Sequence, residues 1–300
     1  MSEFRSGFVS IVGRTNVGKS TLLNSLVGEK IAITANKCQT TRTAIRAIVN
    51  RDNSQIIFVD TPGIHKPKTK LGDTMLETVW TTIPNCDVTL FMIDATSEKI
   101  GKGDQIILDK IKELKGKTIL VINKIDLIEK EKLLKLIDLY RNEYEFNAII
   151  PVSAMKSENI EAILTEIERT LPEGPAYYDI DEYTDQTERQ IAEEIVREKA
   201  LKLLDEEIPH GIYVETQKMS LRKTTKKEEI YDIEVIIYCL RDSHKGIIIG
   251  KSGAMLKRIG MYARQDLEKI LKTKVNLKIW VKVKENWQDN ISIVNKFKLK

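Results

Sequence analysis

The sequence predicts two domains of different fold class: an α/β domain with a mostly parallel sheet and helices on both faces, then a smaller α+β domain. The chain has 300 residues, about twice the ~150 residues of a typical domain. Its first part alternates continuous apolar runs with amphipathic segments, as strands buried on both faces alternate with helices. This alternation stops at Leu171-Pro-Glu-Gly-Pro175, which is followed by a polar, acidic stretch typical of a linker.

Apolar runs and amphipathic segments give the order of elements. In the first part, strands are expected at 8–12, 44–50, 55–60, 87–94, 118–123 and 148–153, and helices from Lys19 and near 104–114, 131–142 and 159–170. The second and third strands are close enough in the chain for an antiparallel hairpin at the sheet edge. The second part predicts a helix at 187–205, strands near 211–222 and 230–241, two helices, and a strand at 275–283. We therefore expect domains at 1–172 and 187–300, joined by a linker at 173–186.

Composition excludes several classes of protein. Hydrophobic residues make up 42% and charged residues 31% of the chain, which is ordinary for a globular protein and excludes wholesale disorder. No stretch approaches the ~18 uncharged apolar residues of a membrane span, and the N-terminus lacks the features of a signal peptide. The three cysteines lie far apart and the three histidines are not at metal-ligand spacing. We expect neither a disulfide framework nor a zinc module, and a cytoplasmic location.

Charge is concentrated near the C-terminus. Residues 1–180 carry 24 basic and 24 acidic side chains, whereas residues 241–300 carry 15 basic and 5 acidic ones. Such an excess attracts polyanions, although a solvated lysine-rich surface is the simpler alternative.

The loop after the first strand matches the phosphate-binding pattern G-x-x-x-x-G-K-[ST]. Glycines let the backbone wrap a phosphate, while the loop amides and the following helix N-terminus supply positive potential. Lys19 can reach the β- and γ-phosphates, and the Ser20 hydroxyl can bind Mg²⁺. A match of this kind alone can also be an incidental glycine-rich turn. The candidate phosphate-binding residues are Gly13, Arg14, Thr15, Asn16, Val17, Gly18, Lys19, Ser20 and Thr21.

Three further segments close other strands and specify a guanine nucleotide. The Asp60 carboxylate can hold Mg²⁺ through water, and the Gly63 amide can approach the γ-phosphate. The Asp126 carboxylate can accept from both the ring N–H and the exocyclic amine of guanine, which adenine does not offer, while Asn123 can meet N7. Each segment alone could be a capped turn, but all of them at strand C-termini, where α/β sheets bind ligands, predict one site. The residues are Asp60, Thr61, Pro62 and Gly63; Asn123, Lys124 and Asp126; and Ser153 and Ala154.

These motifs resemble a known family. Residues 7–170 are similar to the GTPase domain of the Ras-like superfamily, and Lys30-Ile-Ala-Ile-Thr34 through Cys38-Gln-Thr-Thr41-Arg42 resembles switch I of the bacterial Era GTPases. That family adds a C-terminal type II KH domain. The segments Glu194–Lys199, Glu206–His210, Ile249–Gly253 and Glu285–Trp287 are similar to it. The resemblance implies a P-loop GTPase domain followed by a type II KH domain.

The resemblance also implies an activity, Mg²⁺-dependent hydrolysis of GTP to GDP, with Lys19, Thr41, Asp60 and Gly63 as catalytic residues. Ser20, Thr41 and Asp60 would hold Mg²⁺, with Thr40 as the competitor of Thr41, and Asn16 matches an asparagine that helps to coordinate K⁺ in relatives. Ile64 stands where many signalling GTPases carry a water-orienting glutamine. The sequence also shows no arginine finger, the arginine that stabilises charge on the γ-phosphate in related GTPases. Arg42 is a candidate for this role by proximity to Thr41, although a surface cation is the simpler interpretation.

In the second domain, Gly250-Lys-Ser-Gly253 at a helix start can press its backbone against nucleic-acid phosphates, as KH domains do. A lone G-x-x-G is weak, but this one lies in the basic segment. The resemblance implies small-subunit ribosomal RNA near its 3′ end and the small ribosomal subunit as partners, beside GTP and GDP, and a monomer. The expected RNA-binding residues are Lys245, Gly250, Lys251, Ser252, Gly253, Lys257 and Arg258.

Two other functions stay open at this point. The first is a GTPase at the inner face of the cell membrane that couples growth to division, with RNA binding secondary. The second is an RNA-binding module with an inactive nucleotide domain, which the complete set of nucleotide motifs disfavours.

Overall fold

The structure is a computed structural model that describes residues 4–35, 37, 40–64, 67–223, 225 and 228–297. It divides into two compact units. The first unit holds the described residues up to Ala32, those from Thr41 to Asp185, and Phe297; the second holds those from Ile33 to Thr40 and from Gln186 to Lys296. Cys38 and Gln39 of the predicted switch I lie outside the described residues.

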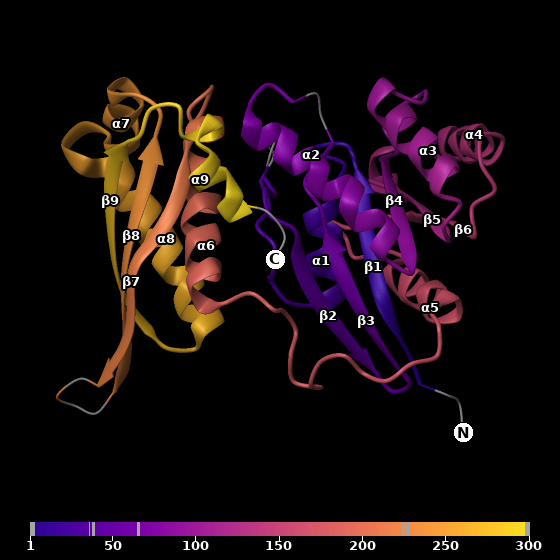
Figure 1. The fold of residues 1–300 in the computed structure, drawn as a ribbon, viewed down its shortest axis with the longest axis horizontal. Helices are drawn as coiled ribbons and strands as arrows, with labels where there is room; N and C mark the ends of the chain where they lie inside the picture. Colours follow the sequence, from indigo (N-terminus) through magenta and orange to yellow (C-terminus); the bar gives the residue numbers. More distant parts are fainter. Residues whose placement is uncertain are drawn as a thin grey trace. The chain divides into compact units, whose positions relative to one another are not determined.

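The first unit is an α/β domain built on one six-stranded sheet (Figure 1). Its strands are β1 (Arg5–Gly13), β2 (Ile45–Arg51), β3 (Ser54–Asp60), β4 (Val88–Asp94), β5 (Thr118–Asn123) and β6 (Ala148–Val152). Its helices are α1 (Lys19–Val27), α2 (Lys70–Thr82), α3 (Lys102–Leu114), α4 (Lys130–Arg141) and α5 (Ile160–Thr170).

The strands lie in the order β2-β3-β1-β4-β5-β6, and every pair is parallel except β2–β3. The predicted edge hairpin is therefore confirmed. The parallel strands are buried on both sides, and in β3 all seven residues are buried, which explains why these strands are continuous apolar runs in the sequence.

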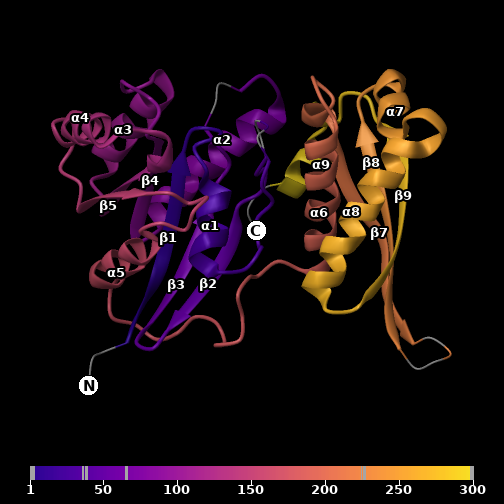
Figure 2. The ribbon, with the colours of Figure 1, turned by 180° about the vertical axis from the view of Figure 1, so that it is seen from behind.

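Helices cover both faces of this sheet. On one face, α1 and α5 bury Leu22, Leu23 and Ile163 against alternate strand residues such as Val9 and Val121. On the other face, α2, α3 and α4 pack their apolar sides against the intervening strand residues. Figures 1 and 2 show these two helical layers from opposite sides. The predicted mostly parallel sheet with helices on both faces is confirmed.

Helix α2 is absent from the sequence-based prediction. Its buried face includes three threonines four residues apart, Thr74, Thr78 and Thr82, beside apolar residues such as Leu71 and Met75. The hydroxyls of Thr78 and Thr82 donate to the carbonyls of Thr74 and Thr78, which allows these polar groups to be buried. The threonines interrupt the apolar periodicity of the segment, so its helical pattern is weak in the sequence.

The segment after α5 is tied to the edge strand β2 and its neighbour β3. The backbone N–H of Ile48 donates to the carbonyl of Tyr183 (3.0 Å), and Thr184 forms an antiparallel bridge with Ala47. Earlier in the same segment, the N–H groups of Tyr177 and Tyr178 donate to the side chain of Gln55 in β3, which in turn donates to the Tyr178 carbonyl. The acidic segment therefore lies along the sheet edge as part of the first unit.

The second unit is an α+β domain with a three-stranded sheet. Its elements are α6 (Glu188–Leu203), β7 (Tyr213–Lys223), β8 (Glu229–Cys239), α7 (Asp242–Ile249), α8 (Ala254–Leu271), β9 (Lys274–Val283) and α9 (Ile291–Val294). The strand order is β7-β8-β9, with β7–β8 antiparallel and β8–β9 parallel. Up to β9 this is the predicted order, and α9 is an addition to it.

Helices α6 and α8 lie side by side against one face of this sheet (Figure 2). They bury Val196, Ala263 and Leu267 against strand residues such as Ile233 and Val235. A capping box begins α6: the Thr187 hydroxyl accepts from the N–H of Gln190, whose side chain accepts from the N–H of Thr187. None of the helices in the described part of the chain combines the length and apolar character that a membrane crossing requires.

Candidate functional site

The predicted nucleotide residues gather at one edge of the six-stranded sheet. In the parallel register, Asp60 lies opposite Ile11, and Asn123 lies between Asp94 and Val152. The loops that carry the four motifs therefore leave the sheet at the same carboxyl edge, where α/β proteins bind ligands.

The loop from Gly13 to Ser20 needs glycine at both of its ends. Gly18 has φ +103°, and a Cβ there would overlap the Nδ2 of Asn123. A Cβ on Gly13 would lie 2.5 Å from the carbonyl oxygen of Met92. The loop then opens α1, whose free N–H groups supply positive potential for an anion.

Lys19 is buried inside this loop, with 6% of its surface exposed. Its Nζ donates to the carbonyls of Gly13 (3.1 Å) and Arg14 (2.9 Å). Burial lowers the pKa of Lys19 to about 8, and the charge of Asp60 opposes this shift. A phosphate bound at the loop would supply the negative charge that this buried ammonium needs.

Three predicted Mg²⁺ ligands converge beside Lys19. The Oγ of Ser20 lies 2.9 Å from the Oγ1 of Thr41, and both hydroxyls donate to Oδ2 of Asp60, at 3.0 and 3.2 Å. Burial raises the pKa of Asp60, while the Lys19 charge and the two hydroxyls oppose the rise. The other oxygen, Oδ1, is buried and has no hydrogen-bond partner among the described residues. A carboxylate with one oxygen not used in a hydrogen bond, next to two hydroxyl groups, fits Mg²⁺, which takes oxygen ligands.

The two competing threonines have different surroundings. The Thr40 hydroxyl donates to the carbonyls of Lys37 (2.6 Å) and Ala35 (3.2 Å), whereas Thr41 meets Ser20 and Asp60. This geometry favours Thr41 as the metal ligand. Arg42 is only 2% exposed, so its interpretation as a surface cation is wrong.

The residues after Asp60 are closely packed. The Thr61 hydroxyl is buried and donates to the Ile11 carbonyl (2.7 Å), which gives this side chain a structural contact. A Cβ on Gly63 would lie 2.8 Å from Cγ2 of Thr15, so the two loops touch here. Ile64 is buried, and its N–H donates to the Gly13 carbonyl (3.2 Å). Ile64 therefore joins the core and offers no group that can orient water.

The expected base-binding residues are tied to the phosphate loop. Asn123 donates from Nδ2 to the Val17 carbonyl (2.8 Å) and accepts at Oδ1 from the N–H of Ala154 (2.9 Å). The Asp126 side chain is 12% exposed, with Lys156 Nζ at 3.9 Å. The Ala154 amide thus already has a protein acceptor in Asn123.

Sequence reasoning missed one partner in this region. Lys124, in a left-handed conformation, donates to Oδ2 of Asp94 (2.6 Å). Asp94 is the last residue of β4, and its Oδ1 accepts from the N–H and hydroxyl of Thr96. The sequence signal was its position at a strand C-terminus, which the other site residues share.

The G-x-x-G turn connects α7 to α8 in the second unit. Gly250, Ser252 and Gly253 have φ values of +74°, +52° and +79°. A Cβ on Gly250 would lie 2.7 Å from Cβ of Met255, whereas a Cβ on Gly253 would meet nothing within 4 Å. The open side of the turn therefore leaves room for a ligand to approach the backbone. Of the predicted basic residues, Lys251, Lys257 and Arg258 are exposed and Lys245 is half-buried.

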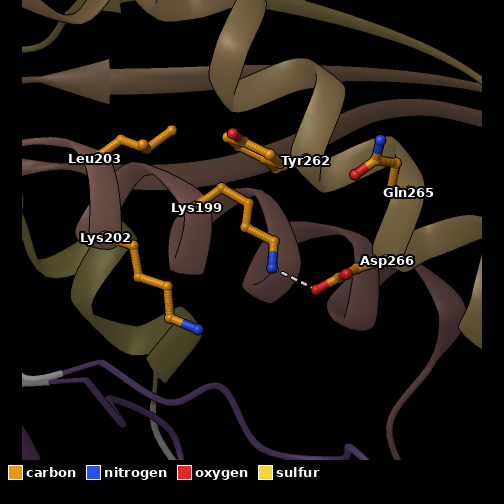
Figure 3. Close-up of a pocket in the computed structure, with 6 residues that line it drawn as sticks. All are labelled: Lys199, Lys202, Leu203, Tyr262, Gln265 and Asp266. Atoms are coloured by element: carbon orange, nitrogen blue, oxygen red, sulfur yellow. Dashed lines mark hydrogen bonds and ion pairs between the residues drawn. The ribbon is translucent and has the colours of Figure 1, made fainter.

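A cavity of about 250 Å³ lies between α6 and α8 in the same unit (Figure 3). Lys199 points across it to Asp266, and both Lys199 and Lys202 bind the fully buried Glu198, at 3.0 and 2.9 Å. Because these cations are matched by carboxylates, the cavity is not a basic site. It is lined by Lys199, Lys202, Leu203, Tyr262, Gln265 and Asp266.

Comparison with protein families matches both units. Residues 8–124 match the family described as 50S ribosome-binding GTPase, and residues 207–288 match the KH domain family. The chain is 50% identical over 293 residues to GTPase Era of Caldanaerobacter subterraneus subsp. tengcongensis, covering 98% of this chain and 97% of the relative. It is also 50% identical over 295 residues to GTPase Era of Clostridioides difficile, covering 98% of each.

Solved structures give the same result. One is Era in complex with MgGDPNP and nucleotides 1506–1542 of 16S ribosomal RNA; it matches with a TM-score of 0.94 and 42% identity over 99% of this chain and 100% of that chain. A variant of Aquifex aeolicus Era bound to GDP and AlF4⁻ matches with a TM-score of 0.93 and 41% identity, over 99% and 100% of the two chains. With the complete set of nucleotide motifs at one sheet edge and a KH domain that follows in the sequence, the chain belongs to the Era family of GTPases.

Proposed function

We propose that this GTPase binds small-subunit ribosomal RNA near its 3′ end through the KH domain and acts in assembly of the small ribosomal subunit. The observation that carries this proposal is the similarity, over 99% of the chain, to an Era structure that contains both MgGDPNP and 16S ribosomal RNA. The open G-x-x-G turn and the basic C-terminal segment support it.

Hydrolysis proceeds by in-line attack of water on the γ-phosphoryl group, and the protein contributes mainly position and charge. In this proposal Lys19 exchanges its loop carbonyls for the β- and γ-phosphate oxygens, and the backbone N–H groups from Gly13 to Ser20 cradle the phosphates. Gly63, which abuts Thr15, brings its amide to the γ-phosphate. Because Ile64 cannot orient the water, intrinsic turnover is expected to be slow.

Ser20, Thr41 and Asp60 would hold Mg²⁺, which neutralises charge on the phosphate oxygens when it is bound. The free Oδ1 of Asp60 supports this assignment. Arg42 follows Thr41 directly in the chain, and a role for its guanidinium at the γ-phosphate stays a prediction.

We further propose that K⁺ supplies part of the missing positive charge through Asn16, which has φ +63° within the phosphate loop. The test is GTP turnover in matched KCl and NaCl. We expect faster turnover in K⁺ for the wild type and no cation preference for Asn16→Ala. Equal turnover of the wild type in both salts would contradict K⁺ binding.

The proposed domains are 1–172 and 187–300 with the linker 173–186, and the proposed state is a cytoplasmic monomer. The three hydrophobic clusters are each formed by buried residues of this one chain, which supports the monomer. Mass measurement by light scattering during gel filtration tests it, and a dimer mass would contradict it.

The test of function compares RNA and membrane binding of the whole protein. We expect submicromolar binding to an oligonucleotide with the 3′-terminal sequence of 16S ribosomal RNA, tighter with a GTP analogue than with GDP, and cosedimentation with small subunits. Preferential sedimentation with anionic lipid vesicles, without RNA binding, would instead support the peripheral membrane GTPase. RNA binding without GTP hydrolysis would indicate an inactive nucleotide domain.

A further inference from the structure

The side chain of Arg14, the second residue of the phosphate loop, is directed into helix α3. Its Nε donates to Oδ1 of Asp104 (2.8 Å), and its Nη2 donates to the hydroxyl of Ser97 (3.1 Å). Asp104 lies in the first turn of α3, and its side chain is completely buried. Ninety residues of chain separate these two partners, and no sequence motif predicts that they meet.

The start of α3 is shaped around this arginine. A Cβ on Gly103 would lie 2.7 Å from Cδ and 2.9 Å from Cγ of Arg14, and a Cβ on Gly101 would lie 3.4 Å from Nη1 of the same arginine. Two glycines at a helix start therefore leave the space that the arginine stem and guanidinium fill. Gly103 lies inside the first turn of α3, where glycine weakens a helix relative to alanine, so this space has a cost in helix stability.

Asp104 is also costly for the fold. Burial raises its pKa, and the charge and hydrogen bond of Arg14 oppose the rise, together with the backbone N–H of Gly101. This ion pair adds little net stability, because the Asp104 carboxylate loses all of its water while the Arg14 side chain stays 31% exposed. Fold stability alone therefore does not explain a buried carboxylate and two glycines that converge on one loop arginine.

The backbone of Arg14 lies at the centre of the nucleotide site. Its carbonyl accepts from Nζ of Lys19 (2.9 Å), and the residue forms a parallel bridge with Ile64, which follows Gly63. Any movement of this peptide changes where Lys19 rests and how the loop meets Gly63. The ion pair to α3 fixes the side chain of the residue that carries these contacts.

We propose that Asp104 is a positioning residue for phosphate binding. Through Arg14, its carboxylate holds the loop around Gly13–Thr15 in the conformation that receives the nucleotide phosphates. This inference rests on the proposed guanine-nucleotide function of the same site. A loop held before the ligand arrives spends less binding free energy on ordering, so losing the anchor should weaken binding.

The experiment measures GDP affinity, GTP kinetics and thermal stability of full-length variants. For Asp104→Ala we expect the Kd for GDP and the KM for GTP to rise by about 10- to 100-fold, as for loss of a charged hydrogen bond. We expect kcat to change by less than about threefold, because the lost order affects ground state and transition state alike. Asp104→Asn keeps an acceptor for Nε of Arg14, so it should restore part of the affinity.

The matched control is Asp109→Asn, at an exposed position of the same helix where Oδ1 of the aspartate accepts from the side chain of Gln105 (2.8 Å). It should bind GDP like the wild type. A double-mutant cycle with Arg14→Ala and Asp104→Ala should be non-additive, since either change removes the same anchor. Additive losses would overturn the proposal.

Three outcomes separate this inference from the alternatives. If Asp104→Asn and Asp104→Ala lower the melting temperature but leave Kd and KM unchanged at a temperature where the variants are folded, Asp104 has a structural role only and the proposal is overturned. If Asp104→Ala does not fold, Asp104→Asn and Arg14→Gln carry the same comparison. If the wild type itself binds no GDP, the proposed function is wrong. If the wild type and the variants bind GDP equally, only the role of Asp104 is wrong.

Discussion

Asn123 at the end of β5 donates a hydrogen bond from its side-chain amide to the backbone carbonyl of Val17 in the phosphate loop, at 2.8 Å. The group expected to contact the base is thus bound to the loop expected to hold the phosphates. Because both groups are buried, the contact is made in low dielectric and excludes water. A substitution that disturbs the base subsite should therefore also weaken phosphate binding, and the reverse should hold.

Asn123→Asp tests this connection. The carboxylate can still accept from the N–H of Ala154, but it loses the donor to Val17 and places a negative charge against that carbonyl. We expect a loss of about 1–3 kcal/mol in GDP binding free energy, measured by titration calorimetry. Asn85→Asp is the control, because its amide also donates to a backbone carbonyl (2.7 Å) but lies at an exposed helix end. Equal losses in both variants would contradict the connection.

Asp126 should decide guanine specificity. In Asp126→Asn an acceptor becomes a donor that faces the exocyclic amine of guanine, and loss of the charged bidentate contact should cost about 2–4 kcal/mol of GTP binding. Xanthine carries a carbonyl at that position, so affinity for xanthosine triphosphate should rise in the same variant. Competition of both nucleotides against a fluorescent analogue measures the switch. Unchanged GTP affinity would exclude Asp126 from the base site.

RNA affinity should depend on the G-x-x-G turn. Replacing Lys251 and Ser252 together with aspartate puts two negative charges where phosphates are expected, so binding of the 16S 3′-end oligonucleotide should be abolished. The control, Lys272→Asp with Thr273→Asp, changes net charge by the same amount at the far end of α8 and should weaken binding only partly. Affinity should also fall as salt rises, since each lysine that contacts phosphate displaces counterions. Similar losses in the two double variants would refute a specific role of the turn.

Cys86, just before β4, should be an unreactive thiol. Burial raises its pKa to about 12, opposed by a hydrogen bond with Ser10. Since only the thiolate is alkylated, modification by iodoacetamide at pH 8 should be at least about 100-fold slower in the folded protein than in urea. Its rate should increase about tenfold per pH unit from pH 7.5 to 9.5. Peptide mapping resolves this cysteine from the others, and a rate that levels off near pH 9 would contradict the raised pKa.

The strands and nucleotide loops could be predicted from sequence because their signals are local. Parallel strands buried on both faces are continuous apolar runs, and each loop motif follows such a run directly. In the KH domain, β9 could likewise be predicted, because its residues alternate between exposed and less exposed positions. The helix α2 was not, since buried threonines replace part of its apolar face.

Contacts between distant parts of the chain could not be predicted. Arg14 meets Asp104, and Lys124 meets Asp94, across 90 and 30 residues. Neither aspartate belongs to a motif, and in sequence Asp104 at the start of α3 is explained by the helix dipole alone. Arg42 was expected at the surface because isolated arginines usually are, and its burial shows only in three dimensions.

The docking of residues near Tyr183 and Thr184 along β2 has a practical consequence for dissecting the protein. An uncovered edge strand is a template for pairing with other chains. A GTPase fragment cut after residue 172 would lose the backbone partner of Ile48 and the bridge to Ala47, whereas one that ends at Asp185 would keep both. The longer fragment should stay soluble at concentrations where the shorter one aggregates. The part of the predicted linker that pairs with β2 should also resist proteolysis.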